Sequence, residues 1–203
     1  MVKFQVKIEN VVAFAVLNRK ISLNKLVEKM NNTEYNPERF PGLVYRISNP
    51  RASALIFSTG KIVCTGAKTI EMAKDATNKV VGDIKKAGIP MPKKFTITIE
   101  NIVASTKIEA KPKLMLEDMA IQMDEVEYDP ERFPGLVYRM RDPRIVFLLF
   151  GSGKIICVGG RNIEDIHKAL GKLKKRLEGM GLKVIPAISQ HIHVQTKSFK
   201  PKS

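Results

Sequence analysis

Polar and apolar residues alternate at the start of the chain and again near its middle. Residues 3–9 read Lys-Phe-Gln-Val-Lys-Ile-Glu, and the stretch from Val11 to Val16 is continuously apolar. Alternation with a period of two is typical of a half-buried strand, so the pattern predicts a long strand over 3–16. Residues 94–106 carry a similar pattern and predict a second long strand.

Apolar residues at helical spacing follow each of these strands. Ser22 precedes a short apolar stripe that ends at Met30, which predicts a short helix with Ser22 as its N-cap. Residues 69–87 carry apolar positions on one side and lysines elsewhere, as expected for a long amphipathic helix. The stretches 113–123 and 162–178 predict a second short helix and a second long helix.

Three short strands are expected between the short and the long helix of the first half. They span about 43–49, 52–58 and 61–65, with turns at Asn49-Pro50 and Thr59-Gly60, and the second half repeats them up to about 159. These strands are apolar on both faces, whereas only two long helices are available to cover one face. The other face would expose apolar side chains and is therefore expected to bind a partner. It would carry Val12, Leu55, Phe57 and Val63, with Val103, Leu148, Phe150 and Ile156 in the second half.

The two halves are copies of one unit. Residues 35–67 and 128–160 align without a gap and are identical at 20 of 33 positions, which chance does not produce. We therefore expect two pseudo-symmetric repeats, 1–92 and 93–182, followed by a mobile basic tail over 183–203.

The net charge of the chain indicates a class of binding partner. The chain carries 35 Lys+Arg against 20 Asp+Glu, a net charge of +15, and both repeats are basic. Such an excess favours a polyanion, most often nucleic acid, although a solubilising surface is the simpler alternative. The sequence has no apolar run long enough to span a membrane and no secretion signal. Its two cysteines indicate reduced core residues in an intracellular protein.

Several motifs, all duplicated in order, resemble the TATA-box-binding proteins, and more closely those of archaea. They are Asn10-Val-Val-Ala13, Pro-Glu-Arg-Phe-Pro-Gly around Phe40, Leu-Ile-Phe57 and the stretch 60–68. The resemblance covers about residues 3–180. It implies an α+β fold, a two-repeat pseudo-symmetric saddle in which a curved ten-stranded antiparallel sheet carries its helices on the convex face. Minor-groove binding with apolar wedges and a sharp DNA kink are established properties of this family.

The resemblance also implies roles for individual residues. The positions that match the family's DNA-intercalating rings are Phe40, Phe57, Phe133 and Phe150. Those that match its minor-groove floor are Asn10, Val12, Leu55, Val63, Thr65, Asn101, Val103, Leu148, Ile156 and Val158. Expected phosphate contacts are Arg39, Arg46, Arg51, Lys61, Lys68, Arg132, Arg139, Arg144, Lys154 and Arg161. Asp129 and Glu131 match positions that meet transcription factor B.

Some features depart from the family pattern. Val158 stands where the first repeat has Thr65, which removes a hydroxyl from the centre, and Arg132 replaces a usual Leu in the second loop. Arg39 and Arg132 could instead be solvated charges, or could pair with the neighbouring Glu38 and Glu131.

The implied function is a general transcription initiation factor that bends A·T-rich promoter DNA in the cytoplasm or nucleoid and recruits transcription factor B and RNA polymerase. The alternative is a saddle that has become a protein-interaction scaffold with loose nucleic-acid binding. A homodimer of the free protein through the apolar face is a further open alternative. No catalytic set, cofactor site or metal site is expected from the sequence.

Overall fold

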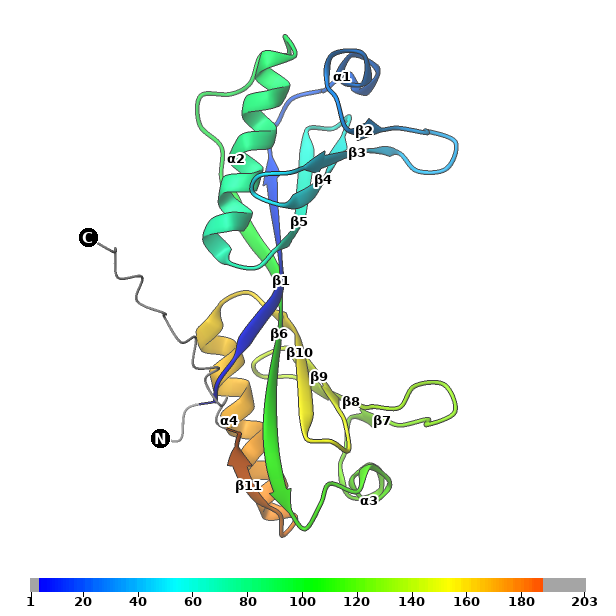
Figure 1. Cartoon of the computed structure of the whole chain (residues 1–203), viewed down its shortest axis with the longest axis vertical. Helices are drawn as coiled ribbons and strands as arrows, with labels where there is room; N and C mark the ends of the chain where they lie inside the picture. The colour runs from blue at the N-terminus through cyan, green and yellow to red at the C-terminus, as the bar shows by residue number, and fades with distance from the viewer. Residues whose placement is uncertain (1–3, 188–203) are drawn as a thin grey trace, which may run out of the picture.

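The computed structural model describes residues 4–187 and contains one large antiparallel sheet. Ten strands follow a continuous path, β2-β3-β4-β5-β1-β6-β10-β9-β8-β7, so that the first repeat forms one half of the sheet and the second repeat the other (Figure 1). The strands are β1 Lys7–Val16, β2 Thr33–Glu34, β3 Gly42–Ile47, β4 Ala52–Phe57, β5 Lys61–Ala67, β6 Ile97–Lys111, β7 Val126–Glu127, β8 Leu136–Met140, β9 Ile145–Leu149, β10 Lys154–Gly160 and β11 Lys183–Pro186.

The two long helices lie on the same side of this sheet, one behind each repeat (Figure 1). The helices are α1 Leu23–Lys29, α2 Ile70–Lys86, α3 Leu116–Gln122 and α4 Ile163–Gly179. Helix α2 buries Val80 and Ile84 in a core with Ile56 and Ile62 of the sheet, and α4 buries Leu170 in the equivalent core of the second repeat. The predicted saddle, with its helices on the convex face, is confirmed.

The two repeats join through β1 and β6, which pair antiparallel at the narrow centre of the molecule (Figure 1). Val11 pairs with Ile102, and on either side Asn10 pairs with Val103 and Val12 with Asn101. These reciprocal pairs place the pseudo-twofold axis between the two strands. The sheet, and the concave surface opposite the helices, are therefore continuous across both repeats.

A hairpin turn links β4 to β5 just beyond Phe57. Gly60 adopts a φ of 88°, and a Cβ there would lie 2.2 Å from the carbonyl oxygen of Arg19. Gly153 occupies the equivalent turn with a φ of 82°. Only glycine fits this conformation and this close approach, so the glycines serve the turns.

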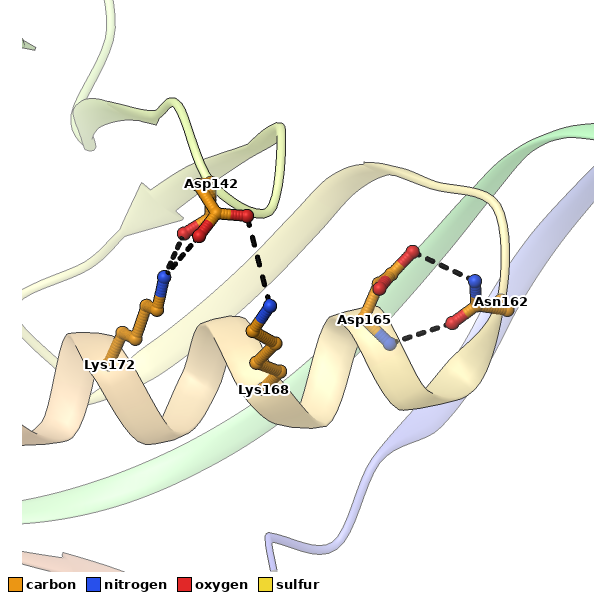
Figure 2. Close-up of polar contacts among 5 residues, drawn as sticks. All are labelled: Asp142, Asn162, Asp165, Lys168 and Lys172. Carbon is orange, nitrogen blue, oxygen red and sulfur yellow. Dashed lines mark hydrogen bonds and ion pairs between the residues drawn. The ribbon is translucent and has the colours of Figure 1, made fainter.

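Helix α4 is fixed at its N-terminus and along its exposed side (Figure 2). Asn162 caps the helix by accepting a hydrogen bond from the backbone N–H of Asp165, at 2.7 Å. Asp142, in the β8–β9 turn, accepts a hydrogen bond from Lys172 and lies 3.8 Å from Lys168. The hydrogen bond from Lys172 and the charges of both lysines lower the pKa of the Asp142 carboxyl. These contacts attach the β8–β9 turn to the convex helix.

The structure departs from the sequence predictions in several places. The two-residue strands β2 and β7 were not predicted, and β6 extends to Lys111 rather than ending near 106. Ser22 stands at the N-cap of α1, but its side chain makes no capping hydrogen bond. The predicted tail began at residue 183, yet Lys183–Pro186 forms β11, which pairs with β6. Val184, only 4% exposed, joins the core, and residues 188–203 lie outside the described residues.

Candidate nucleic-acid interface

The concave surface carries the apolar positions for which the sequence predicts no covering helix. In β4 and β5, Ile56 and Ile62 are fully buried toward the helices, whereas Leu55 and Val63 alternate with them and are half-buried on the other face. The same alternation holds in the second repeat. The half-buried predicted floor residues are Asn10, Val12, Leu55, Val63, Thr65, Asn101, Val103, Leu148, Ile156 and Val158.

Strand register brings these side chains side by side. Leu55 pairs with Val63, and Leu148 pairs with Ile156 in the second repeat. Sequence reasoning missed two members of this surface, Val44 and Val137, which pair with Leu55 and Leu148. Their alternation with buried neighbours could have revealed them. The result is an apolar strip that runs across both repeats.

Two asparagines stand at the centre of the strip with fixed amide orientations. The backbone N–H of Gly66 donates to Asn10 Oδ1 at 2.7 Å, and that of Gly159 donates to Asn101 Oδ1 at 2.8 Å. A backbone N–H is only a donor, so each side-chain oxygen is assigned and each Nδ2 remains a donor. Asn10 Nδ2 donates to Thr65 Oγ1 at 3.0 Å.

The second repeat lacks that last hydrogen bond because Val158 replaces the threonine. Asn101 Nδ2 has no protein acceptor within residues 4–187. The difference between the two repeats that the replacement of threonine by Val158 predicts is therefore present in the structure. The amide of Asn101 keeps both of its N–H donors for a ligand, whereas the amide of Asn10 shares one with Thr65.

A pair of phenylalanine rings stands at each end of the strip. The ring centroids of Phe40 and Phe57 are 5.9 Å apart at an interplanar angle of 66°, and those of Phe133 and Phe150 are 5.7 Å apart at 69°. One ring of each pair comes from a loop and the other from the end of β4 or just beyond β9. None of the four belongs to the buried core, and Phe40 is 40% exposed. A phenylalanine on a strand is usually buried in the core, and these four are not.

The glycines after these loops make room for the rings. A Cβ on Gly42 would lie 2.7 Å from the ring of Phe40 and 3.0 Å from that of Phe57, and Gly135 has the same relation to the second pair. Neither glycine has a positive φ, so space rather than backbone conformation requires glycine here. The Phe-Pro-Gly sequence therefore supplies both the phenylalanine ring and, because glycine has no Cβ, the space that the ring occupies.

The predicted basic positions are all exposed. Arg46 and Arg139 project from β3 and β8 on the concave face, and lie 3.7 Å from Glu34 and 3.4 Å from Glu127. Exposed pairs of this kind are weak, so phosphate groups can compete for these arginines. The exposed residues are Arg39, Arg46, Arg51, Lys61, Lys68, Arg132, Arg139, Arg144, Lys154 and Arg161.

The loops before the phenylalanines present further charges. Asp129 folds its own loop, since its Oδ1 accepts from Glu131 N–H at 3.2 Å and its carbonyl oxygen accepts from Phe133 N–H at 2.9 Å. Asp129, Glu131 and Arg132 are exposed. The pairing of Arg132 with Glu131, and of Arg39 with Glu38, does not occur among the ion pairs of the described chain.

Further concave-face residues escaped the sequence prediction, among them Ser53, Val146 and Thr98, which pair with Thr65, Val158 and Phe14. Phe14 of β1, Ser105 of β6 and the bulged Glu9 lie beside the predicted floor. Continuing the alternation from Asn10 through Val12 would have identified Phe14.

Comparison with known proteins shows the family. The family model described as "Transcription factor TFIID (or TATA-binding protein, TBP)" matches residues 5–87 and 96–180. The chain belongs to the TATA-binding protein family. It is 46% identical over 182 residues to a TATA-box-binding protein of Methanothermobacter thermautotrophicus, covering 90% of this chain and 99% of that one. A TATA-box-binding protein of Archaeoglobus fulgidus is 41% identical over 182 residues, covering 90% of this chain and 100% of its own.

A solved structure supports the same assignment. The Methanococcus jannaschii TBP superposes with a TM-score of 0.78 at 41% identity, covering 86% of this chain and 99% of that one. The resemblance to archaeal members is thereby confirmed. The family is one of DNA-binding transcription factors. Within residues 4–187 no helix is long and apolar enough to cross a membrane, and no cluster of three or more metal-ligating His, Cys, Asp or Glu residues occurs.

Proposed function

We propose that this member of the TATA-binding protein family is a general transcription initiation factor. It binds the minor groove of an A·T-rich promoter element on its concave surface and bends the DNA. The observation that carries the proposal is the pair of accessible phenylalanine rings at each end of a continuous apolar strip. Apolar wedges inserted between base steps at two points kink a duplex.

The strip between the wedges favours A·T pairs. The minor-groove edges of A·T and T·A pairs present only acceptors, whereas a G·C pair adds the guanine amino donor. Against Val12 or Leu55 that donor would be buried without a partner, which costs free energy. The Nδ2 groups of Asn10 and Asn101 supply donors to the acceptors near the pseudo-twofold axis.

Phosphate neutralisation supplies sequence-independent affinity along both edges of the surface. The ten exposed basic residues identified above carry this role, and flexible pyrimidine–purine steps at the wedges lower the cost of bending. The bent DNA is then presented to transcription factor B and RNA polymerase. Asp129 and Glu131, exposed on the second loop, form the contact with transcription factor B.

The test removes one ring from each pair. The double variant Phe57→Ala/Phe150→Ala should lose most of its DNA bending and at least about tenfold in affinity for a TATA duplex. Phe95→Ala is the matched control, because Phe95 packs against the convex core and should leave bending intact. Unchanged bending and affinity in the double variant would contradict the proposal. Such a result would favour a protein-interaction scaffold that binds nucleic acid loosely.

A further inference from the structure

A group of basic residues lies at the outer end of the first repeat and on its adjoining convex side (Figure 1). Two segments form this region: 17–32, which contains α1, and 83–94, which contains the end of α2 and the linker to the second repeat. They hold eight basic residues and only two acidic ones, Glu28 and Asp83. The eight, which we call the basic end patch, are all exposed: Arg19, Lys20, Lys25, Lys29, Lys85, Lys86, Lys93 and Lys94.

Hydrogen bonds hold the two segments side by side. Lys25 Nζ donates to the carbonyl oxygen of Gly88 at 3.1 Å, and the guanidinium group of Arg19 donates to the carbonyl oxygen of Pro90. Leu26 of α1 is buried in the same core as the sheet residues that α2 covers. The patch therefore lies on the helix side of the sheet and stays open when a ligand occupies the concave surface.

The remaining lysines adjoin these contacts. Lys29 and Lys86 line one surface cleft together with Gly88. Lys93 and Lys94 line a second one with Asn78, on the exposed side of α2. The basic side chains of the two segments therefore form one connected region of the surface.

Little of this charge is neutralised within the protein. Lys86 lies 3.6 Å from Asp83, which also accepts a hydrogen bond from Tyr45 and lies 3.2 Å from Lys79. The other seven residues of the patch form no ion pair within residues 4–187. The acceptors that Arg19 and Lys25 use are neutral carbonyl groups, so their charges remain available to an anionic ligand.

The second repeat has the same fold at its outer end but not the charge. The equivalent segments, 110–125 and 176–187, hold four basic and five acidic residues. Asp118 of α3 stands at the position of Lys25, and Glu178 of α4 stands at that of Lys85. Because the second repeat builds these elements without the lysines, the fold does not require them. A ligand is the remaining physical reason for concentrating like charges here.

The composition of the patch favours nucleic acid over an acidic protein. Within the two segments, Val27 is the one large apolar residue that is exposed, at 43%. Protein interfaces need an apolar centre, whereas binding to a phosphate backbone needs only distributed positive charge. We propose that the basic end patch is a second DNA site, which binds the phosphate backbone of a separate duplex without regard to sequence. The protein can then hold two duplexes at once. This inference goes beyond the proposed function and does not depend on it.

The experiment fills the concave surface before it probes the patch. The protein is saturated with a short TATA duplex labelled at both ends for energy transfer, and a second, G·C-rich duplex with a separate dye is titrated into this complex. The second duplex should bind with a dissociation constant of about 1–100 µM and should be released as salt rises. Energy transfer within the TATA duplex should not change during the titration.

Two variants with the same net charge locate the second site. One replaces five lysines of the patch by glutamine: Lys25, Lys29, Lys85, Lys93 and Lys94. It should bind the second duplex at least about tenfold more weakly and keep the wild-type response to the TATA duplex. The control replaces five exposed lysines of the second repeat, Lys111, Lys113, Lys168, Lys175 and Lys183, and should lose about threefold or less.

Three results would overturn the inference. They are failure of the saturated complex to bind the second duplex, displacement of the TATA duplex by it, and equal losses in the two variants. Binding of poly-glutamate but not of the duplex at the patch would identify an acidic protein as the partner and would also overturn it. If the wild type fails to bend the TATA duplex, the proposed function is wrong. The two variants, compared with the G·C-rich duplex alone, then still test the patch.

Discussion

Single residues set the geometry of the wedges, and Gly42 and Gly135 are the least replaceable of them. Each lies under a pair of rings that a methyl group would displace, although its backbone conformation is open to any residue. A sequence shows a glycine, but not whether a turn, a positive φ or a neighbouring ring requires it. The structure shows that the neighbouring rings require glycine at both positions.

Alanine at these positions should therefore impair bending more than stability. In Gly42→Ala/Gly135→Ala the added Cβ atoms, at 2.7 Å from the loop phenylalanines, should push the rings apart and reduce the bend in a duplex labelled at both ends for energy transfer. Gly82→Ala is the control, because nothing lies within 4 Å of its new Cβ and helix α2 should gain about 0.5–1 kcal/mol of stability. Equal bending by the two variants would contradict this account of Gly42.

A second prediction at this scale concerns Tyr45 on the convex side. Burial and the hydrogen bond to Asp83, 2.9 Å long, raise the pKa of Tyr45 from 10.0 to about 12. The folded protein thus favours the neutral phenol. Its stabilising contribution is complete below pH 10 and is lost as the pH rises from 10 to about 12. Thermal unfolding across this range should show a smaller alkaline loss in Tyr45→Phe than in the wild type, and an equal loss would refute the assignment.

Caps and pairing partners determine where helices and strands begin and end. The sequence predicted these boundaries only in part. The long helices were predicted within about two residues, because their apolar positions repeat over several turns. The strands β2 and β7 have two residues each and no periodicity of their own; they exist because β3 and β8 offer an edge. β11 likewise forms because β6 extends beyond β1 and leaves an edge for Val184 and its neighbours.

The residues of the candidate site could likewise be predicted from the sequence, whereas some of their contacts could not. The four phenylalanines and the central asparagines were identified from their resemblance to a family, and the structure places them on one face. The sequence could not indicate that Asn10 and Asn101 have their oxygens held by glycine N–H groups from another strand. Nor could it reveal the contact of Ser105 with Glu9, because the two residues are far apart in sequence and meet only through the β1–β6 register.

Capping gives a prediction at the scale of the element. Thr69 accepts a hydrogen bond from Met72 N–H at 3.1 Å at the start of α2, whereas Ser22 makes no such bond at the start of α1. Thr69→Ala should therefore lower the free energy of unfolding by about 1 kcal/mol. Ser22→Ala should change it by at most about 0.5 kcal/mol, as at an ordinary surface site. Chemical denaturation of both variants checks this, and similar losses would show that the capping assignment is mistaken.

The whole molecule combines a basic surface with an apolar strip, so its affinity for DNA should depend strongly on salt. With ten exposed basic residues available, the slope of log affinity against log salt should be steeper than about −3. Titrations of a TATA duplex over a series of salt concentrations measure this slope. Arg46→Gln/Arg139→Gln should make it shallower by about 2, whereas Lys74→Gln/Lys175→Gln on the convex helices should not. A slope near zero would exclude phosphate neutralisation as a main source of affinity.

The central claim is that this saddle bends a specific A·T-rich element. The most direct test is fluorescence energy transfer between the two ends of a duplex that contains a TATA element, measured beside a shuffled duplex of the same composition and repeated at moderate salt. The account predicts that transfer rises only with the TATA duplex and persists at moderate salt. If both duplexes bind alike, stay straight and dissociate together as salt increases, the protein has the family's fold without DNA bending, and the proposed function is wrong.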